Sequence, residues 1–376
     1  MQLDRPTFRK IEAVGWTVVI CSLCLFFWNF FTFVGVCLLV RYAFMTFKRR
    51  QLPDVDPAGK WVLVTGCDSG FGLGLAKRLY ERGFNVFATC LDPRQGGGAE
   101  LRSLGSSSQS SGGENGDRAS SGGVTLKVLA LDVTDDVSVA HCLEIVRREC
   151  SNSGLWGLVN NAGFNFVGDV ELTTVEQYLM QGNVNLYGAV RTCKAFLPLI
   201  RQARGRIVNV TSVKGLCVSP NCAAYCITKF GLEAFSDSLR IEMEQFGISI
   251  SIIEPCNFGG ITGCLNEPAL KRIKSQLDEQ WAEASDDVKQ LYGEEHLPRQ
   301  LEEARKSAST TAPTIEPVLR AFEDALCSPC PKVRYLVKGS NSYFDFYYLL
   351  GLICPYVPQR LFDKMRAYFL PYHIYK

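Results

Sequence analysis

The 376-residue chain is nearly balanced in charge, with 40 Lys and Arg against 38 Asp and Glu, and 47% of its residues are hydrophobic. The net charge of +2 and the lack of a basic stripe give no support for nucleic-acid binding. The length suits one large domain with appendages. The 16 cysteines are scattered through apolar patterns, so we expect reduced thiols in a cytosol-facing compartment rather than a disulfide framework.

No metal site is expected. Cys327 and Cys330 form a C-x-x-C pair, but no second pair or nearby histidine completes a zinc site. The three histidines, at positions 141, 296 and 373, are too dispersed for a metal site or a hydrolytic triad.

Residues 1–50 predict an N-terminal membrane anchor. Residues 13–40 carry no charge, and 28 residues exceed the ~20 needed for a membrane-spanning helix. The run is too long for a signal-peptide core and lacks the Arg-rich, amphipathic character of a mitochondrial transit sequence. A re-entrant hairpin is the alternative. Three basic residues precede the run and four follow it, which favours a cytosolic location for the downstream part.

A proline-containing linker, 51–60, precedes a main domain at 61–338, in which strand and helix patterns alternate. This alternation predicts βαβ units. We expect strands at 61–65, 85–91, 125–131, 155–160, 205–211, 248–254 and 333–337. A Gly/Ser-rich run at 93–123 is expected to form a flexible insertion, because it holds too few apolar side chains to offset the entropy of ordering.

A glycine-rich turn follows the first predicted strand. Gly66, Gly70 and Gly72 lie in TGCDSGFG, directly before a helical pattern. Missing side chains allow the backbone to approach a pyrophosphate, and the helix N-terminus stabilises its charge. We therefore expect this turn, with Asp68, Ser69 and Phe71, to bind a dinucleotide.

Further cofactor contacts are expected where the next strands end. Asp92 follows the second strand, where an acid hydrogen-bonds the ribose and repels a 2′-phosphate, so NAD is favoured over NADP. Asp132, with Val133, ends the third strand and is placed to accept a hydrogen bond from the adenine. Small residues after the fourth strand let the cofactor pass over it: Asn161, Ala162 and Gly163.

A catalytic group is predicted at 212–229. Tyr225 and Lys229 lie four residues apart at the start of a helical pattern and therefore share a face, and Ser212 ends the preceding strand. An ammonium group near a phenol is expected to lower the phenol pKa from ~10 toward working pH. The serine hydroxyl can hold the oxygen of an alcohol or carbonyl. The three residues fit proton transfer at a C–O bond, coupled to hydride transfer at carbon.

Together these motifs resemble the short-chain dehydrogenase/reductase family, over roughly 60–262. The resemblance implies a Rossmann-type, doubly wound α/β fold with a seven-stranded parallel sheet. It implies that Tyr225 is the acid/base, that Lys229 also holds the nicotinamide ribose, and that Asn185 positions a water in the proton relay. Other implied cofactor contacts are Pro255, Asn257 and Thr262.

One residue departs from the family pattern. Pro255 is normally followed by glycine over the nicotinamide, whereas here Cys256 follows it. A Cβ at this position narrows the space where the backbone approaches the cofactor. A catalytically silent membrane scaffold is therefore an alternative of another class.

The resemblance also bears on the substrate. The blocks WGLVNNAG, FLPLIRQARGRIVNV and YCITKFGLEAFSDSLR resemble the D-β-hydroxybutyrate dehydrogenase branch first, and the membrane-bound hydroxysteroid and retinol dehydrogenases next. This ordering implies oxidation of (R)-3-hydroxybutyrate to acetoacetate, with a hydroxysteroid or retinol as the alternative. A hydroxy acid needs a cationic grip on its carboxylate, for which the candidates are Lys214, Lys271, Arg272 and Lys274.

Two segments after 262 complete the expected organisation. Residues 263–311 are expected to form a substrate lid. Residues 339–376 hold a cluster of Phe and Tyr, which predicts either contact with membrane lipid or packing over the lid or a second subunit. We expect a homo-oligomer, located at the mitochondrial inner membrane by the hydroxybutyrate resemblance or at the endoplasmic reticulum by the N-terminal run.

Overall fold

The computed structural model describes residues 22, 25–44, 47, 52–110, 123–341 and 344–369. The chain divides into two compact units, Met1–Asp54 and Val55–Lys376. In the first, a helix spans Leu25–Phe44 and is long and apolar enough to cross a membrane. The rest of the predicted apolar run, at 13–21, 23 and 24, lies outside the described residues, as do the basic residues around it apart from Arg41.

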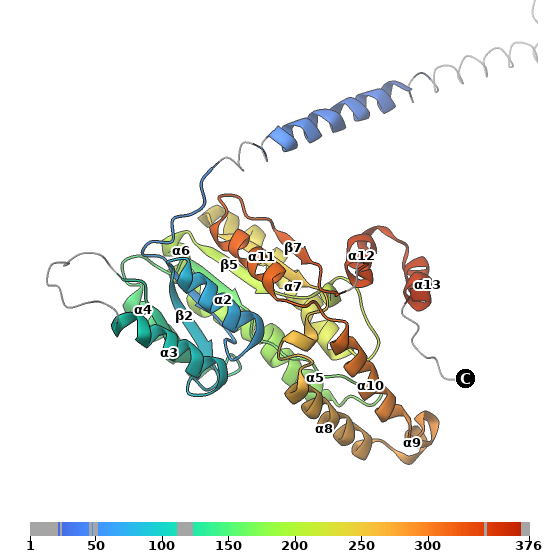
Figure 1. Cartoon of the computed structure of the whole chain (residues 1–376). Coiled ribbons are helices and arrows are strands. Elements are labelled where there is room, and N and C mark those ends of the chain that lie inside the picture. Colours follow the sequence, from blue (N-terminus) through green and yellow to red (C-terminus); the bar gives the residue numbers. More distant parts are fainter. Residues whose placement is uncertain are drawn as a thin grey trace, which may run out of the picture. The chain divides into compact units, whose positions relative to one another are not determined.

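A seven-stranded parallel sheet forms the centre of the second unit, as predicted (Figure 1). The strands are β1 (Trp61–Val64), β2 (Asn85–Cys90), β3 (Leu126–Ala130), β4 (Gly157–Asn160), β5 (Arg206–Val210), β6 (Ser249–Pro255) and β7 (Arg334–Val337). Their order is β3-β2-β1-β4-β5-β6-β7. The order reverses between β1 and β4, and ligands of doubly wound folds bind at such a point.

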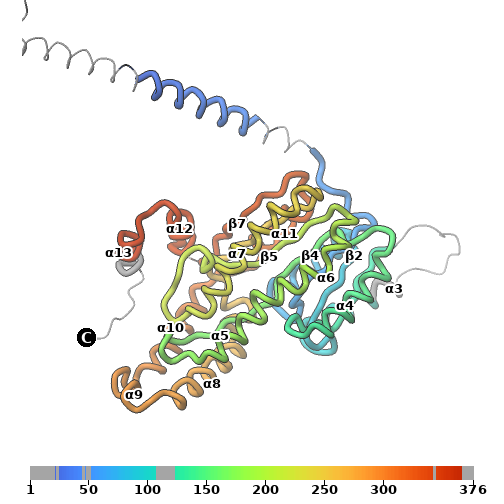
Figure 2. Tube along the Cα trace, turned by 180° about the vertical axis from the view of Figure 1, so that it is seen from behind, coloured from blue at the N-terminus to red at the C-terminus, as the bar shows by residue number. Residues whose placement is uncertain are grey.

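Helices cover both faces of the sheet. On one face lie α2 (Gly70–Glu81), α3 (Gly96–Ser110) and α11 (Glu316–Cys327) (Figure 1). On the other lie α4 (Asp136–Glu149), α6 (Gly188–Ala203) and α7 (Ala223–Met243), which Figure 2 shows from behind. The short α5 (Val175–Gly182) precedes α6.

Successive side chains of β1 pack alternately into two hydrophobic cores. Val62 and Val64 pack with α2 and α11, whereas Trp61 and Leu63 pack with α4 and α6. This is the period of two that a strand imposes. Because both faces of β1 are buried, the strand reads as a continuous apolar run in the sequence.

The expectation of a flexible insertion at 93–123 is wrong for its first half, because α3 is ordered there. Leu101 is fully buried against the core on the α2 side. The glycines serve close packing: a Cβ on Gly97 would lie 2.5 Å from the Cys67 carbonyl oxygen. Tertiary packing thus overrides the weak helix propensity of this Gly/Ser-rich run. Residues 111–122 lie outside the described part of the chain.

The region expected to form the lid is helical, with α8 (Glu267–Glu283), α9 (Asp286–Tyr292) and α10 (His296–Ser309). The Asp169 carboxylate, after β4, hydrogen-bonds His296 and Gln300 of α10. This contact ties α10 to the segment that follows the fourth strand.

The C-terminal segment forms α12 (Phe346–Ile353) and α13 (Gln359–Phe369). Leu350 and Phe362 are buried in a small cluster with Val213, close to the carboxyl end of β5. Tyr356 and Leu361 are exposed. Residues 342, 343 and 370–376 of the predicted aromatic segment lie outside the described residues.

Candidate active site

A cavity of about 730 Å³ lies at the carboxyl ends of β1, β4, β5 and β6, and its volume falls within the usual range of ligand pockets. Most of the sequence-predicted site residues line it: Gly66, Asp68, Ser69, Gly70, Phe71, Asp132, Val133, Asn161, Ala162, Gly163, Ser212, Tyr225, Lys229, Pro255, Asn257 and Thr262. Gly72, Asp92 and Asn185 are not part of this lining. The glycine turn and the tyrosine therefore face one continuous space.

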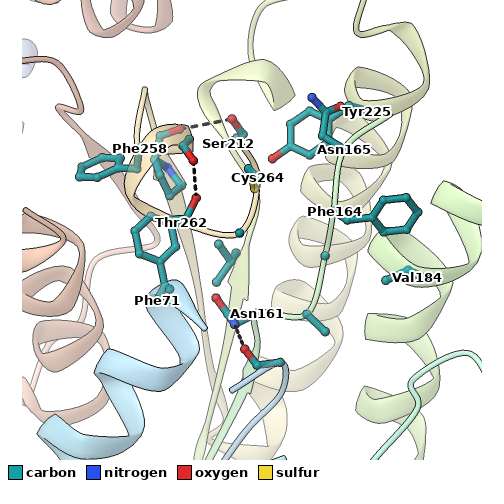
Figure 3. A pocket seen from close by; sticks show the side chains of 18 of the residues that line it. Phe71, Asn161, Phe164, Asn165, Val184, Ser212, Tyr225, Phe258, Thr262 and Cys264 are labelled. Atoms are coloured by element: carbon teal, nitrogen blue, oxygen red, sulfur yellow. Dashed lines mark hydrogen bonds between the residues drawn. The ribbon is translucent and has the colours of Figure 1, made fainter. Parts of the chain in front are cut away.

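The glycine turn is built for close backbone approach. Gly66 and Gly70 have φ values of 69° and 57°, in the left-handed region that favours glycine. A Cβ on Gly72 would lie 2.3 Å from the Gly66 carbonyl oxygen, so Gly72 packs beneath the turn. Asn161 Nδ2 donates to the carbonyl oxygens of Thr65 and Gly66 at 2.9 and 3.0 Å, which fixes the turn against β4 (Figure 3).

The carboxylates at this end of the cavity differ in their partners. Asp68 Oδ1 accepts from the Leu91 backbone N–H at 3.0 Å, which joins the glycine turn to the end of β2. Asp132 Oδ1 accepts from the backbone and hydroxyl of Thr134 at 2.8 and 2.7 Å. Asp92 instead pairs with Arg94 at 3.0 Å and lies outside the cavity lining.

Ser212 and Tyr225 meet at the opposite end of the cavity. The phenol end of Tyr225 points toward Ser212 and Cys264 (Figure 3). A hydrogen bond with the Ser212 side chain lowers the Tyr225 pKa. Ser212 Oγ also donates to the Pro255 carbonyl oxygen at 3.3 Å. Lys229 lies one turn along α7 from the tyrosine, with Nζ 5.3 Å from the centre of the Tyr225 ring.

Burial dominates the protonation of the tyrosine and the lysine. The expected lowering of the Tyr225 pKa is wrong for the protein alone, because burial raises it well above the usual value despite the opposing effects of Lys214 and Ser212. Burial also lowers the pKa of Lys229 to about 8. Both shifts disfavour the charged forms, as expected for groups removed from water. The resting phenol is therefore protonated at neutral pH.

Asn185 lies behind the cavity wall, in a π-helical stretch, Asn183–Tyr187, between α5 and α6. Its Oδ1 accepts from the Phe164 N–H at 3.0 Å, and its Nδ2 donates to the Phe164 carbonyl oxygen at 2.8 Å. Nδ2 also lies 3.3 Å from Thr228 Oγ1, on α7. Asn185 thus links the segment after β4 to the helix that carries Tyr225. Single π-helical turns of this kind are frequent at functional sites.

Cys256 leaves the cavity open. Its backbone N–H donates to the Val337 carbonyl oxygen at 2.9 Å, and its side chain packs against the cluster formed by Val213 and α12. The cavity runs from the glycine turn past this residue to Tyr225. The Cβ that departs from the family pattern is thus accommodated by packing on the C-terminal segment.

Several lining residues were not identified from the sequence. Asn165 follows the predicted NNAG segment, and its Oδ1 is buried without a hydrogen-bond partner in the described structure. Cys264 comes from the start of the expected lid, and Tyr347 comes from α12. Only the position of Asn165, two residues after Gly163, offers a local signal; the other two are brought in by tertiary packing.

The four candidate cations for a carboxylate separate into two groups. Lys214 and Arg272 line the cavity, whereas Lys271 and Lys274 do not. Lys274 instead pairs with Asp278 at 2.7 Å on the outer face of α8. The guanidinium of Arg272 lies 5.7 Å from the ring centre of Phe164.

Comparison with known proteins identifies the family of this chain. The profile of a family described as short chain dehydrogenase matches residues 60–264. A mitochondrial D-beta-hydroxybutyrate dehydrogenase of Bos taurus is 38% identical over 338 residues, which cover 88% of this chain and 91% of the bovine protein. Retinol dehydrogenase 16 of Mus musculus is 37% identical over 303 residues, covering 80% and 86% of the two chains.

Solved structures show the same fold. A short-chain dehydrogenase from Streptomyces avermitilis superposes with a TM-score of 0.53 at 22% identity, covering 83% of this chain and 96% of that one. A short-chain dehydrogenase/reductase from Burkholderia phymatum, solved with NAD, gives a TM-score of 0.58 at 18% identity, with coverages of 75% and 90%.

Proposed function

The chain belongs to the short-chain dehydrogenase family and is an oxidoreductase acting on CH–OH groups, and we propose that it oxidises (R)-3-hydroxybutyrate to acetoacetate with NAD. The observation that carries the proposal is the joint lining of one cavity by the glycine turn and by Ser212, Tyr225 and Lys229. The 38–39% identity to D-beta-hydroxybutyrate dehydrogenases supports the choice of substrate.

The residues of the glycine turn fit a dinucleotide. Gly66 and Gly70 present backbone without a side chain to the cavity, Gly72 packs beneath them, and α2 begins there at Gly70. The Asp68 carboxylate, bonded to the Leu91 N–H at the end of β2, favours NAD because it repels a 2′-phosphate, and Asp132 is the proposed acceptor for the adenine. Asn257 and Thr262 are the proposed contacts at the nicotinamide end. When bound, NAD supplies the acceptor for the hydride.

Tyr225 is the proposed acid/base. In its deprotonated form it accepts the hydroxyl proton during oxidation, and in its protonated form it donates a proton during reduction of the ketone. Ser212 holds the substrate oxygen beside the phenol, and the Lys229 ammonium stabilises the phenolate. The raised pKa of the resting phenol suits the acid role in reduction. Asn185 is proposed to hold a relay water next to the Phe164 segment to which it is bonded.

Retinol is the second candidate substrate. The apolar helix Leu25–Phe44 favours it, since this segment resembles the anchors of membrane-bound retinol and steroid enzymes. The apolar side chains of Phe164, Met180 and Leu265 in the cavity wall are compatible with such a substrate. We propose membrane anchoring in both cases, at the mitochondrial inner membrane for a hydroxybutyrate enzyme and at the endoplasmic reticulum for a retinol enzyme. The exposed side chains of Tyr356 and Leu361 are proposed to contact lipid, and the enzyme is proposed to be a homo-oligomer.

One experiment tests the function directly. The full-length protein, purified in detergent with phospholipid, is supplied with NAD and in parallel with (R)-3-hydroxybutyrate, estradiol, a corticosteroid and retinol, and NADH is measured. We expect NADH formation with hydroxybutyrate. Turnover of retinol or a steroid alone would replace the proposed substrate. No NADH formation, together with no NADH binding by fluorescence, would favour the silent scaffold.

A further inference from the structure

The Lys214 side chain is enclosed at the end of the cavity that holds Tyr225. Lys214 belongs to a 3₁₀ turn, Val213–Gly215, directly after Ser212. Its Nζ donates to Cys222 Sγ at 2.9 Å. In the described part of the chain, Lys214 forms no ion pair with Asp or Glu. The protein thus holds an amine at its site without a carboxylate to balance the charge.

This amine is protonated and retains free donors. Burial by itself lowers the pKa of Lys214, but the neighbouring Cys222 thiol and Tyr347 phenol raise it above the usual value. An ammonium has three N–H donors, of which one is directed at the thiol. An enclosed ammonium without a counter-ion is costly, so an anionic ligand in the cavity is favoured.

The position of Lys214 relative to Ser212 limits the size of that ligand. The Lys214 backbone N–H donates to Ser212 Oγ at 3.2 Å, so the two residues form one short, fixed segment. The Lys214 ammonium also acts on the Tyr225 phenol, whose pKa it lowers, and all three residues line the same cavity. A ligand whose hydroxyl lies between Ser212 and Tyr225 therefore reaches the amine with an anionic group close to that hydroxyl.

We propose that Lys214 binds the carboxylate of a short hydroxy acid and thereby selects acids over neutral alcohols. Ser212 and Tyr225 hold the hydroxyl of the same molecule. Tyr347, brought into the cavity wall by α12, places a second polar group next to the amine. The inference rests on the proposed function and deepens it, because it assigns the group that separates hydroxybutyrate from retinol.

Arg272 is the competing anchor, and the structure favours Lys214 over it. Arg272 is exposed on α8, and its guanidinium lies over the Phe164 ring. Lys214 is more enclosed, and it shares its segment with the serine. An ion pair at the enclosed site is less screened by water and therefore stronger.

The test compares an acid with its neutral counterpart. Wild type, Lys214→Met, Lys214→Gln, Lys214→Arg and Arg272→Met are assayed with 3-hydroxybutyrate and with its methyl ester. Lys271→Met, an exposed change outside the cavity, is the matched control. Competitive inhibition by butyrate, which has the carboxylate but no hydroxyl, reports carboxylate binding without turnover. NADH binding shows that each variant is folded.

We expect Lys214→Met and Lys214→Gln to raise KM for the acid and the inhibition constant of butyrate by about tenfold or more, with kcat/KM for the ester nearly unchanged. Lys214→Arg should restore part of the acid activity. Three results would overturn the assignment to Lys214 and leave the proposed function standing. They are unchanged butyrate inhibition in folded Lys214 variants, equal losses of activity with the acid and the ester in those variants, and a selective loss of acid activity in Arg272→Met alone. A wild type that oxidises retinol and no acid would overturn both.

Discussion

Lys229 Nζ lies 5.3 Å from the centre of the Tyr225 ring and donates its hydrogen bond to the Val210 carbonyl oxygen at 2.8 Å. The lysine is thus held by the end of β5 rather than by the phenol. This contact keeps the amine at one place in the cavity, where it can also interact with a ribose or a phenolate. In the protein alone, burial opposes the charge on both side chains.

Tyr225→Phe removes the proposed acid/base and little else. We expect kcat to fall by about 10²- to 10⁴-fold, because proton transfer by a positioned side chain contributes about that much. NADH binding, measured by fluorescence, should be nearly unchanged. Tyr356→Phe, at an 86% exposed tyrosine, is the control and should retain full activity. Substantial activity in Tyr225→Phe would remove this residue from the mechanism.

Lys229 makes stability depend on pH. The amine titrates at about 8 in the folded protein and near 10.5 when unfolded, so burying its charge costs about 3 kcal/mol below pH 8. The cost disappears as the pH rises from about 8 to 10.5. Lys229→Met loses the hydrogen bond to the Val210 carbonyl oxygen, which costs about 1 kcal/mol of stability. The same substitution removes the cost of burying the charge.

We therefore expect the Tm difference, Lys229→Met minus wild type, to be more positive at pH 6.5 than at pH 9.5. Thermal unfolding of both proteins without cofactor, at the two pH values, measures this difference. Lys271→Met, at an exposed site, should show no such dependence. A constant Tm difference across the two pH values would show that Lys229 is not buried as a charged group.

The sheet and the catalytic segment were predictable because their signals are local. Continuous apolar, β-branched runs located all seven strands to within two residues at either end. Spacing alone placed Tyr225 and Lys229 on one helix, and the glycine turn between β1 and α2 follows from residues that are adjacent in the chain.

What was not predictable depends on contacts between distant segments. The helix α3 forms because Leu101 reaches the core, which composition does not reveal. Tyr347 enters the cavity because α12 packs on Val213. The Tyr225 pKa was expected to fall because of the lysine, whereas the enclosing residues raise it by desolvation. Each of these features follows from burial, which a single sequence indicates only indirectly.

Leu101→Ala tests whether α3 contributes to the fold. Leu101 is fully buried in the core that also contains α2 and α11. We expect the free energy of unfolding to fall by about 2–5 kcal/mol, the usual cost of truncating a buried leucine. Ser103→Ala, on the exposed side of the same helix, should change it by less than about 0.5 kcal/mol. Equal stabilities in chemical denaturation would contradict the ordered helix.

Gly72→Ala tests the packing beneath the cofactor turn. The new methyl group would lie 2.3 Å from the Gly66 carbonyl oxygen and 2.6 Å from Asn161 Nδ2, so the turn must move. We expect the Kd for NADH to rise by about tenfold or more, because the turn no longer offers its backbone to the pyrophosphate. Gly123→Ala, where an added Cβ meets nothing within 4 Å, is the matched control. Fluorescence titration of both variants measures the effect, and a wild-type Kd in a folded Gly72→Ala would place the dinucleotide away from this turn.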